Sequence, residues 1–243
     1  MNNVNIFCFG YGQVAKNFIK KIRSKNLKIN LSGSAGQSLG AFGIKGLKLK
    51  VIGDANDYVG KGLSGSTIVI KPPPECNLIS NENTIIGNTV LYGATSGKLF
   101  ASGQSGERFA VRNSGAITVI EGCDSNACEY MTGGAVVVLG EVGDNFGAGM
   151  TGGMAFIYDL NNEFEKRANP ESIVWQSIET EYWINYLKSL VQEHFKETSS
   201  NLSKKIIENF EEEILNFIQV CPKEMVNKLK NPISLKLTIK EVS

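Results

Sequence analysis

The sequence predicts a mainly β protein, a parallel β-helix, and two observations carry that prediction. A small-residue turn that contains glycine recurs, and an apolar run follows each copy at once. Taking one glycine per copy, the intervals are 19, 32, 18, 19 and 19 residues, and a fixed period near nineteen is typical of stacked coils. The glycines at these predicted corners are Gly46, Gly65, Gly97, Gly115, Gly134 and Gly153.

The length of the period decides between architectures. A βαβ unit needs about 30 residues, so a period of nineteen is too short for it. Two short strands and two corners fit, which is one rung of a β-helix. The runs ITVI and VVVL are rich in β-branched residues, as expected of strands that are buried in a coil. Six or seven rungs, each about 4.8 Å from the next, would make a rod of roughly 30 Å.

Corners of such a coil need residues that tolerate positive φ or close backbone approach, which explains the glycines. Four asparagines recur near the corners: Asn56, Asn88, Asn113 and Asn145. We interpret them as corner formers, with a ladder of ligands as the alternative. The charged residues of the corners are Asp54, Asp57, Glu107 and Arg108. We expect these to pair or cap at the corners, where backbone groups need partners, and to take no part in catalysis.

The long interval between two copies contains KPPPECNLISNEN, which begins at Lys71. Three consecutive prolines cannot lie inside a strand ladder, because proline lacks the amide hydrogen. The stretch therefore predicts a loop that bulges from one rung, and the next rung resumes at NTIIGNTVLYG.

Residues 1–30 differ from the repeat in residues 31–159 and form a predicted short strand, turn and basic helix. Gly10, Gly12 and Ala15 match the G-x-G-x-x-A dinucleotide fingerprint in a strand–turn–helix setting. The acidic residue expected about 20 positions later is missing, so these three are weak candidates for cofactor binding. A fused remnant, a cap over the open end of the coil and a transit peptide are the other interpretations.

Residues 160–243 are predicted to form a helical tail that packs on the β-helix. Asn169 followed by Pro170 predicts a helix start, and Ser199 or Ser200 a second one. We interpret His194, near the end of the first helix, as a residue favoured by the helix dipole.

The secondary structure near the end of the chain is predicted from the positions of two prolines and from an alternation of apolar and polar residues. Pro222 predicts a third short turn of helix, which Pro232 ends. Residues 233–243 alternate between apolar and polar like a terminal strand. The apolar faces of these tail elements would bury against the side or end of the coil.

Composition excludes several classes of function. A net charge of +1 gives no sign of nucleic-acid binding, and no apolar run approaches a membrane span of ~20 residues. The five cysteines are Cys8, Cys76, Cys123, Cys128 and Cys221. Their odd number suggests no disulfide framework, so we expect a cytoplasmic protein. Cys123 and Cys128 could be half of a metal site, but without a second pair we interpret them as core or corner thiols and expect no metal.

Several motifs together carry a family resemblance. GSAGQSLGAF, GDANDYVGKGLSG, CEYMTGGAVVVLG and NFGAGMTGGMAFIYD resemble the C-terminal GXGXG domain of the glutamate synthase large subunit. The resemblance covers residues 31 to about 228 and implies a right-handed parallel β-helix with a helical tail. One departure concerns Asn126, which stands where the family usually has a histidine before the CEYM run.

The resemblance also implies what this chain would and would not do. In the full glutamate synthase a glutaminase domain and a barrel with FMN and an iron–sulfur cluster carry the chemistry, and neither fits in 243 residues beside the repeat. We therefore expect a scaffold without catalytic residues or a cofactor of its own, assembling with separate glutaminase and FMN-barrel chains. The sequence leaves the oligomeric state open, with a homo-oligomer among the options. The alternatives are a relict fragment without function and a minimal NAD-binding protein.

Overall fold

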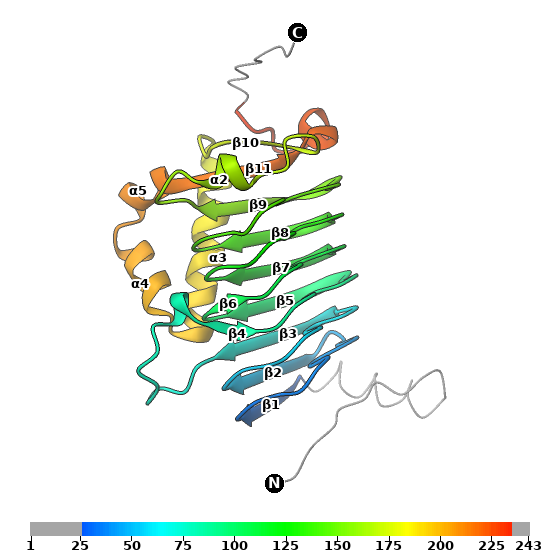
Figure 1. Cartoon of the computed structure of the whole chain (residues 1–243), viewed down its shortest axis with the longest axis vertical. Coiled ribbons are helices and arrows are strands. Elements are labelled where there is room, and N and C mark those ends of the chain that lie inside the picture. The colour runs from blue at the N-terminus through cyan, green and yellow to red at the C-terminus, as the bar shows by residue number, and fades with distance from the viewer. Residues whose placement is uncertain (1–25, 235–243) are drawn as a thin grey trace, which may run out of the picture.

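A computed structural model describes residues 26–234 and shows a stack of parallel coils (Figure 1). Each coil adds one strand to a nine-stranded sheet in the order β1-β2-β3-β5-β7-β8-β9-β11-β10, and pairing is parallel from β1 to β9. The parallel strands are β1 (Leu27–Ser32), β2 (Leu47–Ile52), β3 (Ser64–Lys71), β5 (Ser96–Ala101), β7 (Ser114–Ile120), β8 (Thr132–Val138) and β9 (Gly152–Tyr158). The mainly β, parallel-coil prediction is confirmed.

The strand register reproduces the period of the sequence. Lys48 pairs with Thr67 and Ala135 with Met154, which is 19 positions along the chain in both cases. Strand β1 begins at Leu27, so the stack starts slightly before the predicted boundary at residue 30.

From β3 onward both faces of the strands are largely buried, which explains their apolar runs. In β3, Ile68 and Ile70 point into the coil, and Val69 between them lies in a second apolar cluster outside it. The same alternation holds in β8, where Val136 faces inward and Val137 outward. The outer cluster is completed by the helical tail.

The return half of each coil contains less strand than the repeat predicts. Only β4 (Thr84–Ile86) and β6 (Gln104–Ser105) pair as a small sheet, and single bridges such as Cys123 with Val142 continue it. The residues that follow have positive φ at every second position. We call this wall the positive-φ ladder; it comprises residues 38–42, 58–62, 89–93, 108–112, 126–130 and 145–149.

Hydrogen bonds between coils hold the positive-φ ladder together. Arg108 donates its amide to the Ser125 carbonyl of the next coil at 2.9 Å, and Ala110 donates to Val90 of the previous coil at 2.9 Å. Donation thus alternates in direction along one segment. Because most reversed residues, Ala110 and Arg112 among them, have their amide in such a bond, the ladder keeps these side chains in a backbone region that normally favours glycine.

The six glycines of the repeat fall into two groups. Five have positive φ: Gly46 (93°), Gly65 (112°), Gly97 (111°), Gly134 (89°) and Gly153 (86°). Gly115 does not, and it is restricted by space instead. A Cβ atom there would lie 2.1 Å from the Thr95 carbonyl oxygen, so the backbones of two coils approach too closely for a side chain.

The proline-rich stretch is a loop, as predicted. It leaves the stack after β3, contains the short 3₁₀ helix η1 (Ser80–Glu82), and returns to the stack at β4.

The tail contains two strands where the sequence predicts helix. After the short helix α2 (Phe164–Arg167), residues Ile173–Ser177 form β10, which pairs antiparallel with β11 (Phe217–Pro222), and β11 pairs antiparallel with β9. Asn169 therefore does not start a helix; its side chain accepts from the amide of Glu171 at 3.1 Å in a turn. The two strands cover the edge of the last coil, which would otherwise expose unpaired backbone groups.

The remaining tail elements lie along the stack (Figure 1). They are α3 (Glu181–Thr198), α4 (Asn201–Glu208), α5 (Phe210–Glu213), η2 (Ile214–Asn216) and η3 (Lys223–Lys228). Ser200 caps α4 by accepting from the Ser203 amide at 3.1 Å, as predicted. Helix α3 crosses the strands and packs on their outer face. The predicted terminal strand lies almost wholly outside the described residues.

Candidate functional site

A buried polar cluster lies between the coils and the tail. Glu121 directly follows β7 and is fully buried, and its Oε1 atom accepts hydrogen bonds from the Ser102 hydroxyl at 3.0 Å and from the Ser200 hydroxyl. The Nε2 atom of His194 lies 3.6 Å from the same oxygen. We call Ser102, Glu121, His194 and Ser200 the Glu121 cluster. It joins three segments that are far apart in the sequence.

His194 lies near the end of α3, as predicted, but the helix dipole is not its main surroundings. The structure places it in the interior, with no exposed surface and its ring 6.1 Å from that of Phe100. The signal for this was present, because His194 continues the apolar spacing of Leu187, Leu190 and Val191 on the buried face of α3.

Opposing effects act on the Glu121 carboxyl. Burial alone raises its pKa, but the nearby imidazole of His194 and the hydroxyls of Ser200 and Ser80 outweigh this, and the pKa lies below its ordinary value. Three polar atoms of the pair have no hydrogen-bond partner: Glu121 Oε2 and both ring nitrogens of His194. The cluster is sealed from solvent, so it does not resemble an open catalytic site.

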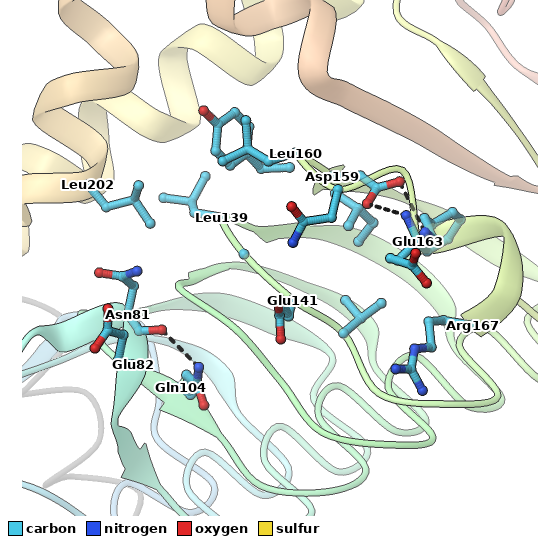
Figure 2. A pocket seen from close by; sticks show the side chains of 16 residues that line it. Asn81, Glu82, Gln104, Leu139, Glu141, Asp159, Leu160, Glu163, Arg167 and Leu202 are labelled. Atoms are coloured by element: carbon cyan, nitrogen blue, oxygen red, sulfur yellow. Dashed lines mark hydrogen bonds between the residues drawn. The ribbon is translucent and has the colours of Figure 1, made fainter.

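A hollow of about 400 Å³ lies between the loop, the β8 and β9 ends and α2 (Figure 2). Its polar groups are largely engaged in structure. Gln104 donates to the Asn81 carbonyl at 2.8 Å, and the Asp159 carboxylate accepts from the amides of Glu163 and Phe164 at 3.0 Å, which caps α2. The carboxylates of the lining face no histidine, cysteine or serine, so the hollow offers no nucleophile–base pair.

A second hollow of about 460 Å³ lies between the loop and the α3–α4 junction. Ser102 and Ser200 line it, so it borders the Glu121 cluster. Half-buried Cys76 is part of the loop wall.

The outer surface of the positive-φ ladder carries aromatic and cationic side chains. The Lys61 ammonium lies 5.5 Å from the ring centre of Tyr58 and 6.0 Å from that of Tyr92, and the Arg112 guanidinium lies 5.9 Å from that of Tyr130. Tyr58 and Tyr130 are 37% and 53% exposed. We call these five residues the aromatic face. Tyrosine and arginine side chains are enriched in the cores of protein interfaces.

The polar and charged side chains at the corners bond to backbone amides or to charged side chains of neighbouring coils. The Asp57 carboxylate accepts from the Asn88 amide at 2.8 Å, and the Asn88 side chain accepts from the Glu107 amide at 2.8 Å. Arg108 lies 3.8 Å from Glu129. These contacts stabilise neighbouring coils and leave no acid–base pair aimed at a cavity.

Asn126 belongs to a short ladder of amides. Its side-chain oxygen accepts from Asn145 at 2.9 Å, and Asn145 in turn accepts from Asn169 at 2.8 Å. Asn126 also has a φ of 61°, a conformation that asparagine tolerates well. The position therefore has a structural role in this chain.

The thiols inside the stack are unsuited to chemistry. Cys123 and Cys128 are buried, and burial raises the pKa of both thiols. Residues 26–234 contain no group of three histidine, cysteine or carboxylate side chains that could hold a metal ion. The fingerprint residues Gly10, Gly12 and Ala15 lie outside the described residues.

Comparison with known proteins agrees with the architecture. The model of the GXGXG motif family matches residues 4–223. The chain belongs to the GXGXG motif family. The matched region includes most of the segment that the sequence analysis sets apart from the repeat.

Individual relatives are glutamate synthases. The chain is 58% identical over 210 residues to a glutamate synthase [NADPH] large chain of Azospirillum brasilense, which covers 86% of this chain and 14% of the relative. A ferredoxin-dependent glutamate synthase of Pyropia yezoensis is 49% identical over 89% of this chain and 14% of the relative. A glutamate synthase [NADH] of Schizosaccharomyces pombe is 48% identical over 82% and 9%. The chain thus spans a seventh or less of these relatives.

Within the described part of the chain, no helix is long and apolar enough to span a bilayer.

Proposed function

We propose that this chain is the β-solenoid scaffold of a glutamate synthase, holding glutaminase and FMN-barrel parts in place without catalysing a step itself. The observation that carries the proposal is the similarity to glutamate synthases over more than four-fifths of this chain but at most a seventh of theirs. FMN and the iron–sulfur cluster would belong to the other parts.

The arrangement of polar groups supports a structural role. The Glu121 cluster is closed to solvent, and the carboxylates of exposed corners cap backbone amides. Residues 26–234 contain no group of three histidine, cysteine or carboxylate side chains, so this part of the chain offers no set of ligands for an iron–sulfur cluster.

The aromatic face is the surface that fits a docked catalytic part. The tail covers the outer face of the sheet, whereas Tyr58 and Tyr130 on the ladder stay exposed with cations beside them. The curated relatives contain several times more chain than this one, and we propose that the counterpart of that additional chain docks on the aromatic face. Aromatic and arginine side chains are the residues that most often dominate interface energies.

The test is affinity capture from the source cells with this chain as bait, followed by mass spectrometry, absorbance near 450 nm and an assay of glutamine-dependent glutamate formation. We expect glutaminase- and FMN-barrel-type chains with a flavin signal and activity in the eluate. A Tyr130→Ala, Arg112→Ala variant should lose most of this recovery, and a Glu211→Ala variant on the tail should not.

Two results would overturn the proposal. A colourless eluate without such chains would favour a relict fragment. Conversion of glutamine or oxidation of NADH by the purified chain alone would show chemistry that a scaffold does not perform.

A further inference from the structure

The Glu121 cluster places a fully buried carboxylate within ion-pair distance of a fully buried histidine. We propose that Glu121 and His194 form an ionic lock, in which an ionised carboxylate and a protonated imidazole hold the helical tail on the coils and couple its docking to proton binding. This inference is independent of the proposed scaffold function.

The lock joins three chain segments at one oxygen atom. Glu121 comes from the end of β7, Ser102 from the end of β5, and His194 and Ser200 from α3 and the α4 cap. Ser200 also accepts from the Ser203 amide at 3.1 Å, so the first turn of α4 is ordered by the same hydroxyl that donates to Glu121. Displacing the tail would remove His194 and Ser200 from this carboxylate.

The contacts favour an ionised Glu121. Its Oε1 atom faces two hydroxyl donors and a ring nitrogen, and a carboxylate accepts all three more strongly than a carboxylic acid does. An ionised group with no exposed surface requires a compensating charge. Within the described residues, His194 is the basic group that lies within ion-pair distance of it.

The counter-charge that Glu121 requires assigns the proton to His194. The Nε2 atom of His194 lies 3.6 Å from Oε1, within ion-pair distance, and the ring packs 6.1 Å from that of Phe100. A neutral ring would leave the buried carboxylate without a counter-charge, whereas an imidazolium supplies that charge.

The other charged groups of this interface lie at its partly exposed rim. Helix α3 contributes Glu193, 2.7 Å from Lys98 of β5, and Glu197, 2.5 Å from Lys48 of β2. From the β2 and β3 side come Lys50, which contacts the Glu197 carbonyl at 3.5 Å, and Lys71, whose pKa is lowered by burial and by Lys50. The carboxylates of Glu193 and Glu197 pair with Lys98 and Lys48, so neither of them is paired with the interior His194.

The sign of the pH dependence follows from Glu121. Its pKa is lowered in the folded chain, so its stabilising contribution is present above the pKa of the unfolded state and is lost as pH falls through the folded value. Docking of the tail should therefore weaken on the acidic side, as the carboxylate takes up a proton.

The chain has one histidine, which makes the lock directly observable. In ¹⁵N-labelled full-length protein at pH 7, we expect the imidazole nitrogens of His194 to show the shifts of a doubly protonated ring. In Glu121→Gln, which keeps the shape of the side chain, the ring should be neutral at the same pH. Glu193→Gln is the matched control, because it removes a neighbouring carboxylate of α3, and there the ring should stay protonated.

Hydrogen exchange provides the second readout. Amides of α3 and α4 should exchange at least about tenfold faster in Glu121→Gln than in the wild type, while those of β8 and β9 keep their rates. A neutral His194 in the wild type at pH 7, or the same ring protonation in wild type and Glu121→Gln, would overturn the proposal. The wild-type spectrum decides the question even if a variant fails to fold.

Discussion

Alanine substitutions at three glycines distinguish two sources of destabilisation in the coil: backbone strain at positive φ, and steric contact between an added Cβ atom and the neighbouring coil. Gly93 has a φ of 64°, and a Cβ atom added there would meet open space, since no atom lies within 4 Å. Gly115 has no positive φ, but its Cβ would lie 2.1 Å from the Thr95 carbonyl oxygen. Gly134 combines both, with a φ of 89° and 2.2 Å to the Ala116 carbonyl oxygen.

The expected losses of unfolding free energy follow from these geometries. At Gly93, backbone strain of about 1–2 kcal/mol is partly offset by about 0.4–1 kcal/mol from a less flexible unfolded chain, leaving ~1 kcal/mol. At Gly115, forcing the coils apart costs roughly 1–3 kcal/mol, with the same offset. At Gly134 strain and contact act together, so Gly134→Ala should lose about 3 kcal/mol.

Urea unfolding followed by circular dichroism measures all three variants against the wild type. The order of stability should be Gly93→Ala, then Gly115→Ala, then Gly134→Ala as the least stable. Equal losses at Gly93 and Gly134 would refute the role assigned to the close approach of the coils. A neutral Gly115→Ala would do the same, because no strain in φ can mask the contact there.

Three further outcomes are expected. Thr118 has a buried hydroxyl without a partner and lies in register between apolar neighbours, so Thr118→Val should stabilise the chain by about 1 kcal/mol in the same urea assay; a loss of stability would indicate an undetected partner. Cys123 and Cys128 have raised pKa values, so their contribution is complete below the ordinary thiol range and declines as pH rises through it; unfolding free energy should fall between about pH 8 and 10, and less so in Cys128→Ala. Phe100→Ala should cost about 3–5 kcal/mol, because the ring is fully buried between sheet and tail; thermal unfolding within a few degrees of the wild type would contradict this.

The stacking of coils could be predicted because it repeats. A glycine corner and an apolar strand recur at a period that the pairing of Lys48 with Thr67 reproduces, and the triple proline marks the one long loop. Each signal has a local cause. Glycine recurs where the backbone has positive φ or where two coils approach closely, and proline has no amide hydrogen to donate to a strand ladder.

Features that depend on contacts between distant segments could not be predicted. Residues Ile173–Ser177 form a strand because β11 arrives beside them from about forty positions later in the chain. The positive-φ ladder places Ala110 and Arg112 in reversed conformations that their own propensities oppose, and bonds to the adjacent coils hold them there. The role of His194 depends on Glu121, which is distant in the sequence and lies beside it only in the folded chain.

The spacing of the ladder has a consequence for where the chain accepts additional residues. In three coils the first reversed residue lies six positions before the residue that begins the next strand, namely Tyr58 and Ser64, Arg108 and Ser114, and Asn126 and Thr132. That half of the coil is fixed in length by bonds on both sides. The opposite corner is free, and after β3 it already accommodates a long loop. A peptide tag or a small domain spliced into the loop between Lys71 and Asn83 should therefore be carried outside the stack, whereas one added residue in a ladder segment would put every later coil out of step.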